Sequence, residues 1–141
     1  MADAVTIKYI YPANHDGGAN PIPTRKVVVG MVGLSDGTGE TSVVKVRLTD
    51  LMKHDGLTPT RTAVERIQGN IQGMTVVLAW DRALAAGIKM LGPGVYDLDF
   101  RGTGGIVDPG EDGDRTGNIT LTSLYADSGD TYDLTLTVRL K

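Results

Sequence analysis

Thr131-Tyr132-Asp133-Leu134-Thr135-Leu136-Thr137-Val138-Arg139-Leu140-Lys141 is the stretch that decides the fold. Apolar and polar side chains alternate along it without a break. A period of two residues is typical of a β-strand that has one buried and one wet face. Full burial of each aliphatic side chain contributes roughly 1.5–3 kcal/mol before conformational entropy is subtracted. We therefore predict that this stretch is a core strand.

The segment immediately before it predicts a partner strand. Within 117–125, Ile119 and Leu121 alternate with polar residues. The intervening Asp127-Ser128-Gly129-Asp130 has the composition of a turn. Two alternating segments joined by a turn predict a β-hairpin, here of 117–125 with 131–140.

The same patterns predict strands in the rest of the chain, at 4–11, 25–34, 42–49, 61–71, 74–80 and 94–100. Val27–Val32 is apolar throughout, which is typical of a central strand or of one buried on both faces. Trp80 continues the apolar face of its strand, so we expect it in the core or as an interface anchor. Helix is scarce: one turn at 49–54, and one short helix over Arg82–Met90 that Gly87 weakens.

About eight strands separated by turn signals predict an all-β fold, an antiparallel β-sandwich or a jelly-roll-like arrangement. We expect a single β domain spanning 1–141, since neither a repeat nor a linker interrupts the pattern. Two extended loops, 12–24 and 101–116, are the segments most suited to reach a partner, because long loops in small domains are usually functional. The candidate partner-contact residues in them are His15, Asp16, Asn20, Arg101, Asp108, Glu111, Asp112 and Asp114.

Charge and cysteine content exclude several classes of function. The 141 residues include 14 basic and 17 acidic ones, interspersed, with a net charge of −3. No basic stripe favours a nucleic-acid partner. Without cysteine there is neither a disulfide nor a thiolate zinc site. The opening MADAVTIKYIY does not read as a signal peptide, and no apolar run approaches the ~20 residues that cross a bilayer. We expect no membrane partner.

Residues with catalytic potential are few and unfavourably spaced. His15 and His54 each lie in a turn-like His-Asp-Gly, and no G-x-S-x-G elbow accompanies them, so both are expected to be ordinary loop residues. The acidic cluster within 108–114 does not match the EF-hand spacing and is expected to be a solvated loop. The glycine-rich stretches lack phosphate-loop spacing. We therefore predict a non-enzyme with no cofactor and no metal.

Three stretches, in this order, resemble small virion structural proteins of tailed bacteriophages. They are GLSDGTGETSVVKVRL at 33–48, GMTVVLAWD at 73–81, and the TGNITLT strand with the following SGDTY within 113–140. The MADAVT opening is similar as well. The chain departs from that family in its 12–24 loop and its 108–114 insertion, so no residue role is carried over there.

The resemblance implies a capsid decoration, or cement, protein of the virion surface, synthesised in the host cytoplasm. Its partners would be the major capsid protein and further copies of itself, as a homotrimer. Two alternatives stay open at this point. One is a tail or adaptor component of the virion. The other is a carbohydrate-binding β-sandwich on the virion surface, with calcium held by the acidic loop.

Overall fold

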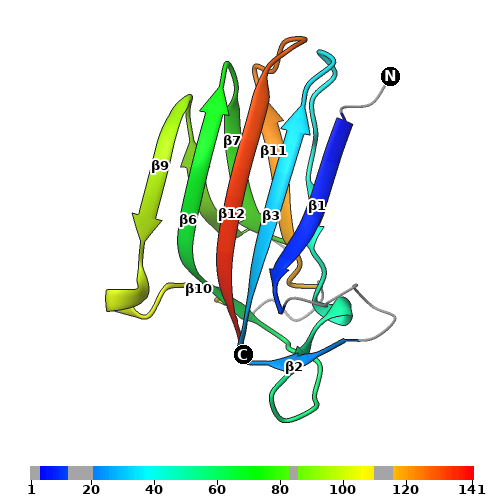
Figure 1. The fold of residues 1–141 in the computed structure, drawn as a ribbon, viewed down its shortest axis with the longest axis vertical. Coiled ribbons are helices and arrows are strands. Elements are labelled where there is room, and N and C mark those ends of the chain that lie inside the picture. Colours follow the sequence, from blue (N-terminus) through cyan, green and yellow to red (C-terminus); the bar gives the residue numbers. More distant parts are fainter. Residues whose placement is uncertain (1–3, 13–20, 83–85, 110–115) are drawn as a thin grey trace.

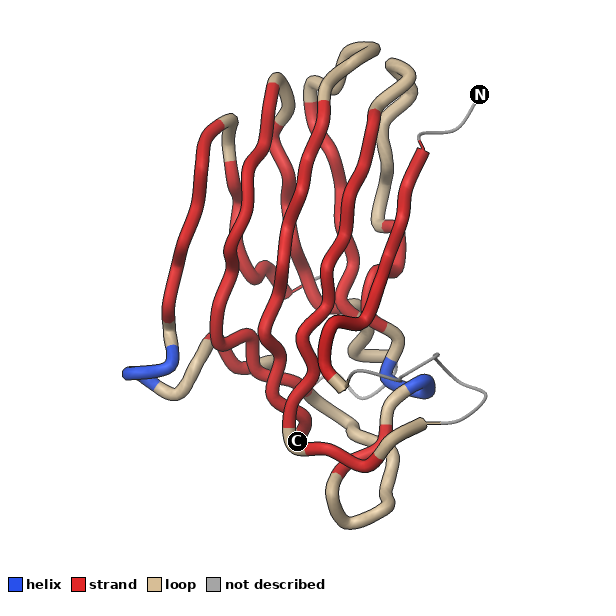
Figure 2. Tube along the Cα trace, in the orientation of Figure 1, coloured by secondary structure: helices blue, strands red, loops and turns tan. Residues whose placement is uncertain are grey.

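Two β-sheets packed face to face make up most of the structure (Figure 1). The computed structural model describes residues 4–12, 21–82, 86–109 and 116–141. The strands are β1 (Ala4–Tyr11), β2 (Pro23–Thr24), β3 (Lys26–Leu34), β4 (Val43–Val46), β5 (Met52–Lys53), β6 (Thr62–Gln72), β7 (Thr75–Trp80), β8 (Ala86–Leu91), β9 (Gly94–Asp99), β10 (Ile106–Val107), β11 (Ile119–Leu124) and β12 (Thr131–Leu140). Two 3₁₀ turns, η1 (Leu48–Asp50) and η2 (Arg101–Thr103), are the helical elements of the described chain (Figure 2).

The larger sheet has the order β1-β3-β12-β6, and β9 and β10 both pair with the far edge of β6. The smaller sheet has the order β4-β11-β7-β8. Every pairing within these two sheets is antiparallel, while the short β2–β5 pair is parallel. The predicted all-β, sandwich-like fold is confirmed. The jelly-roll alternative stays a prediction.

β12, the strand predicted with most support from the sequence, lies at the centre of the larger sheet. It pairs with β3 from Thr131 to Arg139 and with β6 from Thr131 to Leu140. Its alternating apolar side chains face the smaller sheet and are buried. They join a core to which both sheets contribute, as in a sandwich whose inner faces interdigitate. Trp80 is a core residue: it is 1% exposed, and its indole N–H donates to Thr62 Oγ1 at 2.9 Å.

All eight predicted strands are present, within a few residues of their expected ends. The short helix expected over Arg82–Met90 is wrong, because Ala86–Leu91 form the edge strand β8. β8 pairs with β7, and its Ile88 and Leu91 are buried in the core. A short apolar run fits either a helix or a strand, and here the free edge of β7 decides between them.

The predicted hairpin of 117–125 with 131–140 is also wrong, because β11 lies in the smaller sheet and β12 in the larger one. The turn at 127–130 does form, with Asp130 N–H donating to Asp127 O at 3.1 Å. It redirects the chain from one sheet to the other, beside the β3–β4 connection that crosses in the opposite direction (Figure 1). The two crossings are joined at Ser35, whose N–H donates to Asp130 O at 2.8 Å.

The two segments expected to be irregular contain short elements. Pro23–Thr24 form β2 at the end of the 12–24 loop, and Ile106–Val107 form β10 inside the 101–116 loop. β10 is fixed by pairing with β6, opposite Val64 and Ala63. The single helical turn expected over 49–54 is only partly present: η1 covers Leu48–Asp50, and Met52–Lys53 form the short strand β5 instead.

Gly33 is required by the packing of the buried Tyr132 ring across the β3–β12 pair. A Cβ at Gly33 would overlap the ring, which is 2% exposed. The ring has little freedom to move, since its hydroxyl donates to Glu40 Oε2 at 2.6 Å. We predict that Gly33→Ala lowers the free energy of unfolding by about 1–3 kcal/mol through overpacking. Urea unfolding measures this, with Gly102→Ala as the control because open space surrounds Gly102. An equal effect of both substitutions would contradict the packing argument.

Candidate functional site

The structure describes only two of the predicted partner-contact residues, Arg101 and Asp108. Arg101 is exposed in η2, and its Nε donates to Asp99 Oδ1 at 2.9 Å. This hydrogen bond holds the pKa of the Asp99 carboxyl well below its usual range. A contact role for Arg101 stays a prediction. The remaining candidates lie outside the described residues: His15, Asp16, Asn20, Glu111, Asp112 and Asp114.

Asp108 is not part of a solvated acidic loop, so its selection as a contact residue is wrong. Its side chain is fully buried and forms an ion pair with Arg82, whose Nε donates to Asp108 Oδ1 at 2.9 Å. Arg82 also donates to Thr60 O at 3.3 Å. This ion pair holds the segment that follows β10 against the segment that follows β7. This role could not be predicted from the sequence, because Arg82, the partner of Asp108, lies 26 residues away along the chain.

A second buried charge pair lies between β4 and β12. Lys45 Nζ donates to Glu40 Oε1 at 2.6 Å, and Tyr132 donates to the other oxygen of the same carboxylate. Lys45 Nζ also lies 5.7 Å from the centre of the Tyr132 ring, within cation–π range. Each charge has a partner, as burial requires. We therefore interpret this cluster as a structural contact that joins the two sheets.

The outer face of β3 is apolar from Val28 to Leu34, although described residues cover it only in part. Its inner face is in the core, as expected for Val27–Val32, and β3 is central, lying between β1 and β12. On the outer face Val32 and Leu34 are 50% and 49% exposed. Ile10 of β1, 52% exposed, lies against Gly30 beside them. The apolar run of β3 is thus buried on one side only. We call this exposed apolar strip of Ile10, Val32 and Leu34 the β3 face.

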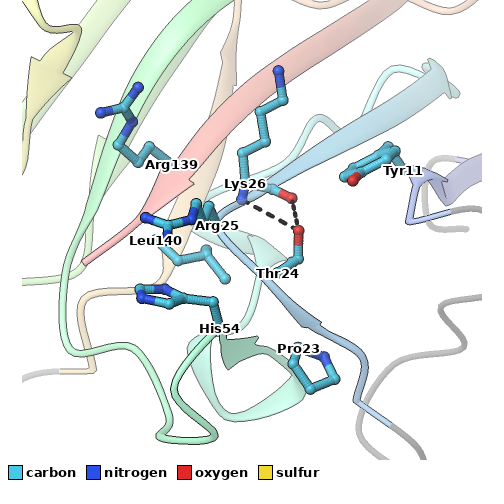
Figure 3. A pocket seen from close by; sticks show the side chains of 8 residues that line it. All are labelled: Tyr11, Pro23, Thr24, Arg25, Lys26, His54, Arg139 and Leu140. Atoms are coloured by element: carbon cyan, nitrogen blue, oxygen red, sulfur yellow. Dashed lines mark hydrogen bonds between the residues drawn. The ribbon is translucent and has the colours of Figure 1, made fainter.

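Basic side chains gather around a cavity of about 640 Å³ at the foot of the β3 face (Figure 3). In the figure Arg139 and Lys26 extend from neighbouring strands, and Arg25 lies over Leu140 near His54. None of the described residues that line the cavity is acidic; they are Tyr11, Pro23, Thr24, Arg25, Lys26, His54, Arg139 and Leu140. Sequence reasoning missed this basic pocket, since its members come from segments far apart in the chain.

Strand register places two of these cations directly opposite each other. Lys26 of β3 is the cross-strand partner of Arg139 of β12, and like charges at such positions are destabilising. Arg139 is partly neutralised by the largely buried Glu65 at 3.0 Å. Arg25 and Lys26 form no ion pair with any described residue. The basic pocket can therefore accept carboxylates or other anionic groups.

His54 is exposed on a turn, and no hydrogen bond joins it to a nucleophilic side chain in the described part of the chain. In the same part of the chain, no group of three or more His, Cys, Asp or Glu side chains could hold a metal ion. None of the described helical segments is long and apolar enough to cross a membrane.

Comparison of the chain with protein-family models, with curated proteins and with solved structures gave no significant match.

The first prediction for this site concerns the buried Arg82–Asp108 pair. Asp108→Asn removes one charge of this buried ion pair, so we expect a loss of about 3–5 kcal/mol in the free energy of unfolding. Urea unfolding measures the loss. Arg101→Ala, which breaks an exposed pair, should leave stability unchanged within error. Equal midpoints for the two variants would show that the buried pair is not needed.

The second prediction concerns the like-charged pair Lys26 and Arg139 at the basic pocket. Lys26→Thr is expected to raise the free energy of unfolding by about 0.2–1 kcal/mol at low salt, because it removes a repulsive cross-strand contact. The gain should vanish near ~0.5 M salt, where screening is short-ranged. Lys8→Thr is the matched control, since the cross-strand partner of Lys8 is Gly30. A gain of equal size in Lys8→Thr would mean that the register-specific repulsion is absent.

Proposed function

We propose that the chain is a structural virion protein of a tailed bacteriophage, a capsid decoration protein that binds the major capsid protein on the virion surface and stabilises the mature shell. It would act without chemistry, by packing against other subunits. The ordered resemblance of 33–48, 73–81 and 113–140 to such proteins supports the virion assignment. The rigid two-sheet core supports a structural role.

The observation that carries the proposal is the β3 face. A strand that is apolar on both sides is typical of sheets covered on both faces, yet on the outer side of β3 the side chains of Val32 and Leu34 are about half exposed. Burying apolar surface contributes about 25 cal/mol per Å², so a partner surface laid over Val32 and Leu34 would gain free energy. On β12, Thr131 and Thr135 lie beside the strip and add hydrogen-bonding groups, and the exposed Asp133 lies opposite Val32, so a partner must also provide a group for one carboxylate.

The basic pocket at the foot of the β3 face suggests the chemistry of the partner. A complementary surface would be apolar along β3 and acidic where it meets Arg25 and Lys26. The two features lie on one side of the larger sheet, so a single docking event can use both. The 101–116 loop would add the exposed Arg101 to this interface, whereas the buried Asp108 would not take part.

Repetition would make weak contacts sufficient. Copies held on a shell, as homotrimers at local threefold positions, bind with the avidity of many linked contacts. Binding only the mature shell would stabilise that state by mass action.

Binding of the purified chain to shells that lack it tests the β3 face. We expect Val32→Lys to reduce occupancy at least tenfold, because it replaces apolar contact surface with a charged side chain that docking would have to desolvate. Met90→Lys is the matched control: Met90 is 64% exposed on β8 of the other sheet. Both variants should melt like the original protein, and occupancy is read by densitometry of pelleted shells. Full occupancy by Val32→Lys would remove the β3 face from the interface.

The copy number in purified particles separates the head from the tail. A ratio near one chain per capsid subunit, or a simple fraction of it, is expected for decoration of the shell. A trace amount would place the protein in the tail or portal instead. Absence from particles would contradict the virion assignment altogether.

A further inference from the structure

In the described chain the two sheets have edges at β1, β4, β8 and β9, with the two-residue β10 beside β9 on β6, and all of these except β1 are protected against pairing with another chain. Natural sheets protect edges by shortness, irregular pairing or charge. β4 is four residues long and irregularly paired, β8 has a register shift, and β9 carries Asp97 and Asp99.

β1 has none of these protections over most of its length. It is eight residues long and pairs regularly with β3 from Ala4 to Tyr9. Lys8 is its only charged residue. Of the four edges in the described chain, β1 is the longest that offers unpaired backbone groups to a further strand.

The side chains of β1 that point toward the smaller sheet are also incompletely covered. Val5 and Ile7 are 36% and 40% exposed, although they lie opposite the buried side of β3. A cavity of about 440 Å³ separates them from Val43 of β4. Tyr9, farther along, is better buried, and burial raises its pKa to about 12. The sandwich is therefore open along the β1 side, with apolar side chains at the opening.

We propose that a second copy of this chain pairs with this edge, β1 to β1, antiparallel and around a twofold axis at Ile7. In this register Ile7 lies opposite Ile7 of the second copy, Val5 opposite Tyr9, and Thr6 opposite Lys8. Side chains that face the smaller sheet in one copy then face it in the other, as the period of two requires. The contact is isologous, so both copies use the same surface.

Charge selects this register among the alternatives. A twofold axis at Lys8 would pair a run of the same length but set the two lysines directly opposite each other, which is destabilising. An axis at Thr6 would avoid that contact but pair a shorter run. With the axis at Ile7, the one charge of each strand lies opposite a neutral threonine, and an aromatic side chain lies opposite a β-branched one, a favourable cross-strand pair.

This contact does not depend on the proposed function, since it requires only two copies of the chain. On a shell of homotrimers, a twofold contact would join neighbouring trimers and not the subunits within one. Loss of shell binding and loss of this contact are measured separately, and either can fail alone.

Disulfide cross-linking tests the pairing directly, because the chain has no cysteine of its own. Under mild oxidation Ile7→Cys should become a covalent dimer, since the two thiols meet at the axis. Val95→Cys is the matched control, 83% exposed on β9 at the opposite edge of the same sheet. We expect cross-linking at least tenfold faster for Ile7→Cys. Equal rates would overturn the proposal.

Two further arms test the register and the interface. A mixture of Thr6→Cys with Lys8→Cys should give mainly the mixed dimer, and a preference for either homodimer would rule out the register. Ile7→Lys and Ile7→Glu should each lose the association that the original protein shows in sedimentation, because like charges would meet at the axis. Mixing the two should restore it. Sedimentation of Ile7→Lys identical to that of the original protein would overturn the contact even if both variants fold normally.

Discussion

The structure depends on a single constraint, the position of β12 between β3 and β6. Both ladders run almost the full length of the strand, so backbone hydrogen bonds on its two sides hold the larger sheet together. Its inward side chains meet the smaller sheet, so the same strand also anchors the core. The uncovered β3 face, the edge strand β1 and the basic pocket all take their positions from this arrangement, because β3 is placed by β12 and β1 by β3.

Much of the local structure could be predicted, because side-chain alternation is a local property of the sequence. Each of the eight expected strands is present, including the short Val43–Val46. Pairing could not be predicted with the same success. The turn before β12 looks like a hairpin turn, yet it takes the chain across to the other sheet, held by hydrogen bonds to Ser35. Nothing near the turn in sequence distinguishes these outcomes, since the deciding partner is distant. The helix expected near Gly87 failed because a free strand edge outweighed local propensity.

The candidate surfaces could likewise be predicted only where they depend on local sequence and not on distant partners. The apolar run of β3 could be recognised in the sequence, and it predicted burial on one or both faces. In the structure the outer face is still exposed at Val32 and Leu34. Asp108 was misjudged because glycine and acidic neighbours suggest solvent, whereas Arg82 buries it from a remote position. The basic pocket was invisible for a related reason. Arg25, His54 and Arg139 lie in three separate segments, and only strand register brings them together in a chain whose overall charge is negative.

The central place of β12 also has a consequence for biosynthesis. Of the strands in the larger sheet it is the last to leave the ribosome, yet its position is in the middle. Until it emerges, β3 and β6 have no partner along the sides that it will occupy. Until then the nascent chain exposes one unpaired side of each of these two strands, a state prone to aggregation and suited to binding by chaperones. Completion of the sheet is then a late insertion step.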